Sequence, residues 1–141
     1  MTNNLEDLKI DVKVKLAALW CSLVLIYLYT DLFGFYTPGH IQDLIDGNLA
    51  GFQITQPLLL GFMILMTLPS LMVILSLILQ AKINRWTNII IDLIQLGFVL
   101  AGIFDLNIYF VFASVVETVL LFLIIWFAWK WLIQENLPTS N

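Results

Sequence analysis

Four long apolar runs, separated by short polar segments, make up most of the chain. They cover approximately residues 14–35, 55–80, 87–104 and 108–130. A helix needs about 20 apolar residues to cross the hydrocarbon core of a bilayer, and each run approaches or exceeds this length. The pattern therefore predicts a transmembrane domain with four spans over residues 14–132.

Polar or mixed segments flank these spans. Residues 1–13 carry Leu5, Leu8 and Val12 at helical spacing, which predicts an amphipathic lead-in at the membrane surface. Residues 133–141 form a polar C-terminal tail. Between the first two spans, the segment HIQDLIDGNL predicts one short surface helix capped by Gly47.

Composition supports a membrane location. The chain of 141 residues is 61% hydrophobic and 11% charged, with a mean hydropathy of +0.97. Soluble domains are about 45–50% apolar and about 25% charged. We predict an all-α integral membrane protein, an antiparallel four-helix transmembrane bundle, in which the short connection between spans three and four makes those two neighbours.

The basic residues predict the orientation of the bundle. All of them fall on one side of the predicted membrane: Lys9, Lys13, Lys15, Lys82, Arg85 and Lys130. Lysine and arginine are enriched in cytoplasmic segments. Both termini are therefore predicted to be cytoplasmic, which agrees with an even number of spans.

Several classes of chemistry find no support in the sequence. The acidic residues are scattered and no basic patch favours nucleic acid. The single cysteine, Cys21, excludes an intramolecular disulfide and is expected to be a small packing residue. No nucleophile can be paired with the single histidine, His40, and no metal-ligand cluster or phosphate-binding loop is present. We therefore expect no metal and no cofactor, and an enzymatic activity is not favoured.

Glu117 is the first candidate site residue. It lies about 12 Å along its helix from the outer surface, near the middle of the membrane, where a charged side chain costs about 2.5–3.5 kcal/mol. We therefore expect Glu117 to face the protein interior, with Ser114 on the same face. It is a candidate site for an ion or a ligand. The alternative is a neutral carboxyl group bonded across helices to Thr67, Tyr27 or Gln95.

Asp92 is the second candidate. Together with Asn88 and Gln95 it forms a polar stripe at helical spacing along the third span. Two interpretations are open, a binding site and a structural ion pair. The ion pair, with Lys130, Lys15 or Arg85 near the cytoplasmic boundary, is the favoured interpretation.

Two further features concern helix packing. Pro69 lies in the middle of the second span and leaves the carbonyl of Leu65 without its helical hydrogen bond. A kink is expected there, with Thr67 and Ser70 helping to satisfy the freed backbone groups. In the third span, the small residues of the segment GFVLA, residues 97–101, predict a close helix contact.

The segments ITQPLLLGFMILMTLPSLMVILS, NRWTNII and ETVLLFLIIWFAWKW resemble a bacterial family of small four-span membrane proteins, domain of unknown function 6326. The likeness covers about residues 14–132, and the segments NRWTNII and WFAWKW are its most specific parts. The resemblance implies a multi-pass protein of the bacterial inner membrane. It implies no activity.

Two main hypotheses for the function remain. A small transporter or ligand-binding protein would use an inward polar track of candidate residues, namely Glu117, Asp92, Gln95, Ser114, Thr67 and Tyr27, and would have a solvated cavity at Glu117. A non-catalytic accessory protein would have a dry core in which every carboxyl group is paired. A membrane enzyme acting on a lipid or quinone is the weakest alternative. The expected partners are the lipid bilayer, further copies of the chain and a small-molecule ligand that the sequence does not identify, and no nucleic acid. Further copies are expected because one copy is too short to enclose a wide pore.

Overall fold

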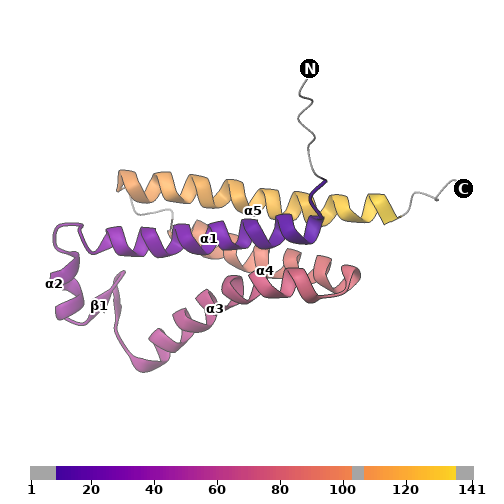
Figure 1. Ribbon diagram of the computed structural model, residues 1–141. Coiled ribbons are helices and arrows are strands. Elements are labelled where there is room, and N and C mark those ends of the chain that lie inside the picture. The colour runs from indigo at the N-terminus through magenta and orange to yellow at the C-terminus, as the bar shows by residue number, and fades with distance from the viewer. Residues whose placement is uncertain (1–8, 103–106, 136–141) are drawn as a thin grey trace, which may run out of the picture.

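The computed structural model describes residues 9–102 and 107–135 of the chain (Figure 1). The elements are α1 (Val12–Gly34), α2 (His40–Ile45), β1 (Asn48–Leu49), β2 (Phe52–Gln53), α3 (Gln56–Ile78), α4 (Ala81–Gly102) and α5 (Ile108–Glu135). The predicted all-α class is confirmed. Most of the predicted lead-in and of the polar tail lies outside the described residues.

Each of the four long helices contacts two others. Helix α1 packs against α3 and α5, and α4 packs against the same two helices; α1 and α5 lie alongside each other in Figure 1. The Lys13 ammonium donates to the carbonyl of Leu79 at 2.8 Å, so the start of α1 meets the end of α3. The hydroxyl of Thr37, just after α1, donates to that of Tyr109 at 3.2 Å. The end of α1 therefore lies beside the start of α5.

The apolar core is narrow and the outer surface is largely apolar. The largest buried side chains of the core include Leu16, Trp20, Leu23, Met72 and Leu121. Large apolar side chains on all four long helices are exposed, as is Cys21, which was wrongly expected to be a packing residue. Such extensive apolar exposure is typical of a surface that faces lipid rather than water.

Three of the described helices are long and apolar enough to cross a membrane: α1, α3 and the part of α5 over Ile108–Trp131. Helix α4 is not among them, although it has 22 residues. One of its faces is polar and buried, with Asn84, Asn88, Asp92 and Gln95 all inaccessible to solvent. These residues lower the mean hydropathy of α4 below that of the other three long helices.

The connection between α1 and α3 contains a small hairpin that the sequence pattern did not predict. Helix α2 ends at Ile45, and strands β1 and β2 pair antiparallel with Leu49 opposite Phe52. The two turn residues, Ala50 and Gly51, have φ values of 50° and 83°. A two-residue hairpin with a type I′ turn needs positive φ at both positions, and alanine at the first gives no clear signal for such a turn.

Candidate functional site

Polar side chains of the four long helices, all buried except the half-buried Thr30, form an inner polar track between these helices. Helix α4 contributes the largest share, because its polar residues recur at helical spacing on the face turned toward the other helices. The inner polar track consists of Trp20, Tyr27 and Thr30 from α1, Ser76 from α3, Asn84, Asn88, Asp92 and Gln95 from α4, and Ser114 and Glu117 from α5.

Asn88 is the centre of a hydrogen-bonded network at one end of the track. Its Oδ1 accepts from the indole N–H of Trp20 at 2.6 Å and from the hydroxyl of Ser76 at 3.3 Å. Its Nδ2 donates to Oδ1 of Asn84 at 2.6 Å. Asn84 in turn donates to the carbonyl of Ser76 at 2.6 Å. The network joins α1, α3 and α4, and each of its side chains forms a hydrogen bond to another residue of the network.

Gln95 bonds to the backbone of α3, the helix that contains Pro69. Its Nε2 donates at 3.0 Å to the carbonyl of Leu65, which is the carbonyl that Pro69 leaves without a helical donor. The prediction that Thr67 and Ser70 would satisfy the freed groups is wrong for this carbonyl. Their hydroxyls donate to carbonyls one turn earlier, at 2.7 and 3.0 Å.

Asp92 is completely buried, and neither of its carboxyl oxygens has a hydrogen-bond partner. The favoured prediction of an ion pair is therefore wrong. All three expected cations lie over aromatic rings instead, with distances to the ring centroid of 5.4 Å for Lys15, 4.9 Å for Arg85 and 5.8 Å for Lys130. Depth explains the difference, since Arg85 lies seven residues, or about 10 Å, before Asp92 along the helix axis.

Tyr27 lies close to both carboxyl groups of the track, those of Asp92 and Glu117, and within electrostatic range of each. Its ring packs edge-on against Phe98, with centroids 6.5 Å apart, and its hydroxyl is buried without a hydrogen-bond partner. The Oε1 atom of Gln95 is likewise buried and unpartnered. This part of the track thus holds several oxygen atoms whose hydrogen-bonding capacity is unused.

Glu117 is 5% exposed and faces the interior, as its depth in the sequence predicted. Its Oε1 accepts from the hydroxyl of Thr30 at 3.5 Å, and Asp31 lies within electrostatic range. None of the expected partners, Thr67, Tyr27 or Gln95, bonds to it in the described part of the chain. Thr30 was missed, although its place three residues after Tyr27 puts both on one face of α1.

The two remaining predicted site residues, Ser114 and Thr67, differ in burial. Ser114 is buried one turn before Glu117 on α5, and its carbonyl accepts from Thr118 at 2.7 Å. Thr67 is partly exposed and its hydroxyl bonds within α3. It is therefore not part of the track. Trp20, Ser76 and Asn84 were not among the predicted site residues, although Asn84 continues the stripe one turn before Asn88.

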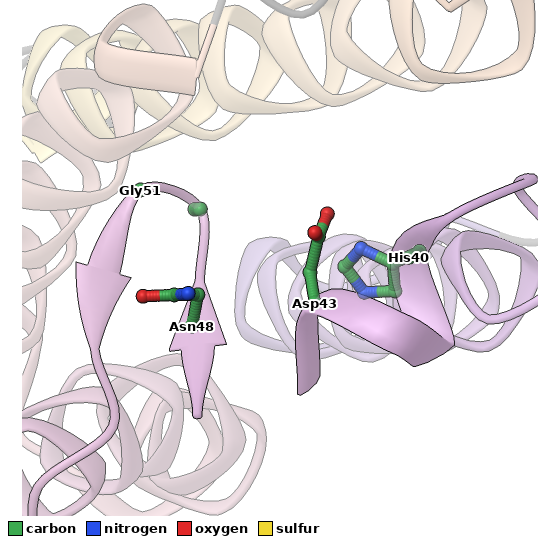
Figure 2. Close-up of a pocket in the computed structure, with 5 residues that line it drawn as sticks. His40, Asp43, Asn48 and Gly51 are labelled. Atoms are coloured by element: carbon green, nitrogen blue, oxygen red, sulfur yellow. The ribbon is translucent and has the colours of Figure 1, made fainter. Parts of the chain in front are cut away.

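Two cavities lie outside the track. The first, of about 390 Å³, is lined by His40, Asp43, Asn48, Ala50 and Gly51; Figure 2 shows that its walls come from α2 and from the β1–β2 hairpin. Among the described residues, no three histidine, cysteine or acidic side chains are grouped to hold a metal ion.

The second cavity, of about 430 Å³, is a groove along α5. Its lining residues are Phe122, Ile125, Trp126, Trp129 and Lys130. Neither cavity is lined by Glu117 or Asp92. The solvated cavity that the transporter hypothesis requires at Glu117 is thus neither of these two.

Comparison with known proteins identifies one family. The model of a family of unknown function, DUF6326, matches residues 6–139, which include every residue of the track. No curated protein and no solved structure gives a significant match.

Proposed function

The chain belongs to the DUF6326 family of unknown function, and we propose from its own geometry that it is a four-span membrane protein that carries a small monovalent cation. In this proposal, a proton or a sodium ion binds at Asp92 and moves along the inner polar track by way of Tyr27 and Glu117. Both termini lie on the cytoplasmic side of a bacterial inner membrane.

The surface of α4 supports its assignment as the fourth span. Apart from Lys82 at its start, the exposed large side chains of α4 are apolar, and they include Ile83, Ile90, Leu93 and Leu100. Its polar face is turned inward, and the helix contacts α3 and α5. A helix with this distribution suits a bilayer, because lipid meets only its apolar side chains and the bundle covers its polar ones.

The unpartnered carboxyl group of Asp92 is the observation that carries the proposal. A charged group buried without a partner is very costly in an apolar interior. A protein keeps such a group inside a membrane chiefly where the group is used, so an intramembrane acid is a functional candidate. A bound proton or monovalent cation would remove the cost, because it neutralises the carboxylate at the same position.

The rest of the track supplies neighbouring positions for the ion. The hydroxyl of Tyr27 and Oε1 of Gln95 are buried oxygens with free acceptor capacity, and oxygen ligands suit hard cations. Glu117 offers a second carboxyl group, and the exposed Asp31 lies beyond it near the end of α1. The oxygens are therefore arranged as a series of sites along the bundle.

Ion flux into proteoliposomes tests the proposal. A potassium diffusion potential set by valinomycin would drive the ion inward, with a trapped pH-sensitive dye reporting protons and ²²Na⁺ reporting sodium in a separate arm. We expect flux with the unmodified protein and none above empty liposomes with Asp92→Asn. The matched control is Asp43→Asn, which removes an exposed carboxylate from α2 and should leave the flux unchanged. Equal flux from Asp92→Asn and the unmodified protein would sink the proposal.

The Asn88 network favours a second candidate function, a non-catalytic accessory protein. Its paired hydrogen bonds join three helices, which is how polar residues fix helix packing in membranes. In that case the chain would act through helix contacts, with copies of itself or with another membrane protein. An absence of ion flux, combined with a stable homo-oligomer in mild detergent, would favour this function over transport.

A further inference from the structure

We propose that the groove along α5 binds an anionic phospholipid of the leaflet that faces the basic end of the bundle. One acyl chain would lie along Phe122, Ile125 and Trp126, and the headgroup phosphate would meet Lys130 and Arg85. This inference rests on the placement of α5 across a membrane, but not on the carriage of an ion by the inner polar track.

The groove has the shape and chemistry of an acyl-chain site. Its lining residues recur on one side of α5 at spacings of three and four, so they form a continuous stripe. Phe122, Trp126 and Trp129 are each about 60% exposed, so most of their apolar surface is open to lipid. The volume of about 430 Å³ lies within the range of small-molecule sites, about 300–1,000 Å³.

The direction of the groove matches one leaflet. From Phe122 to Lys130 the helix rises about 12 Å, which is close to half of the hydrocarbon core, about 15 Å. Lys130 lies near the C-terminal end of α5, among the aromatic side chains typical of a membrane interface. A lipid tail at Phe122 therefore places its headgroup beside Lys130.

Arg85 and Lys130, which have no carboxylate partner in the described part of the chain, lie at the headgroup end. The guanidinium of Arg85 lies 4.9 Å from the ring centroid of Trp129 and 5.3 Å from that of Trp86. Arg85 is only 7% exposed, and its Nε has no hydrogen-bond partner. The ammonium of Lys130 lies 5.8 Å from the ring centroid of Trp126. The buried Nε–H of Arg85 lacks an acceptor, and phosphate oxygens are among the strongest acceptors for arginine and lysine.

Charge favours an anionic lipid over a second copy of the chain. Lys13, Lys15 and Lys82 lie at the same end of the bundle as Arg85 and Lys130. If a second copy packed on this groove in the same orientation, its basic end would lie next to the basic end of the first copy. The two positive ends would repel each other. An anionic headgroup instead meets charges of the opposite sign, and clusters of lysine and arginine next to a membrane attract anionic lipids.

Quenching of tryptophan fluorescence by brominated lipid tests the site in the full-length protein. The protein would be placed in nanodiscs of phosphatidylcholine that contain equal mole fractions of either brominated phosphatidylglycerol or brominated phosphatidylcholine. We expect severalfold stronger quenching by brominated phosphatidylglycerol, and a smaller difference at high salt because salt screens the charges. Native mass spectrometry should show a retained phosphatidylglycerol.

A matched pair of variants locates the effect in the groove. Lys130→Gln removes the cation that lines it, whereas Lys82→Gln removes an exposed cation from the same end of the bundle. Both residues are exposed, so neither change threatens the fold. Lys130→Gln should abolish the preference for phosphatidylglycerol and Lys82→Gln should preserve it. Asp92→Asn should also preserve it, which separates this site from the ion carrier.

Four results would overturn the proposal. Equal quenching by the two brominated lipids would show a groove without headgroup preference. Equal losses from Lys130→Gln and Lys82→Gln would assign the preference to the diffuse charge of the whole end. A shift in tryptophan fluorescence caused by inorganic phosphate in detergent would indicate a site for free anions. Protection of the groove in a cross-linked dimer would identify a second copy as its occupant.

Discussion

The side-chain amide of Gln95 donates at 3.0 Å to the carbonyl of Leu65, one turn before Pro69 in the neighbouring helix. The proline has no N–H to give to this carbonyl. A polar residue of α4 therefore supplies the hydrogen bond that Pro69 removes from the backbone of α3. This contact gives Gln95 a structural role alongside its unpartnered Oε1 in the track.

Gln95→Leu should lower the free energy of unfolding by about 1–2 kcal/mol, because it leaves the carbonyl of Leu65 without a donor in an apolar environment. Pro69→Ala restores the helical N–H to that carbonyl. The loss caused by Gln95→Leu should therefore be smaller in the Pro69→Ala background. Unfolding of all four proteins in detergent would complete the double-mutant cycle. Strictly additive losses would show that the two residues are not coupled.

Asn88→Leu should destabilise the bundle more than any single change at its hydrogen-bond partners. The substitution leaves the indole N–H of Trp20 and the hydroxyl of Ser76 without their acceptor, and interhelical bonds in membranes are worth about 0.6–1.7 kcal/mol each. Thermal unfolding, followed by circular dichroism, would measure the loss. Ser76→Ala is the matched control, since it removes only the weaker 3.3 Å bond; a larger loss from Ser76→Ala would contradict the network.

Asp92→Asn should leave the bundle as stable as the unmodified protein or raise its free energy of unfolding by about 1 kcal/mol. The change removes a buried charge that has no partner, so no interaction is broken. The combination of undiminished stability and lost ion flux is the pattern expected of a residue kept for function. Chemical unfolding in detergent and the flux assay, run on the same preparation, would measure both. Clear destabilisation would reveal a structural bond to Asp92.

Gly97→Ala should leave the stability of a single chain unchanged or raise it by up to about 1 kcal/mol, because glycine weakens a helix interior. An added Cβ meets no atom within 4 Å at this position, and Gly97 and Ala101 are both exposed. The predicted close contact of these small residues is thus not made within the described chain. Size-exclusion chromatography with light scattering would detect a loss of oligomer, the result expected if a second copy packs on this face.

The helices and the polar stripe could be predicted from the sequence because they depend only on the order and spacing of residues that are near each other in the chain. A long apolar run has few structures open to it in a bilayer, and residues three and four apart must share a face of a helix. The inward position of Glu117, the line of Asn88, Asp92 and Gln95, and the carbonyl freed by Pro69 all follow from this. None of them requires knowledge of how one helix sits against another.

Only the tertiary structure decided which groups meet. The rotation of each helix about its axis and the angle between neighbours depend on many weak packing contacts, and the polar pattern of one helix does not specify them. Thus Thr30 rather than Thr67 reaches Glu117, Gln95 rather than Thr67 or Ser70 completes the turn at Pro69, and the cations near Asp92 lie on aromatic rings. In the sequence of a membrane protein, exposed and buried positions are equally apolar. The sequence therefore did not show which face of α5 remains exposed, and the groove could be identified only in the tertiary structure.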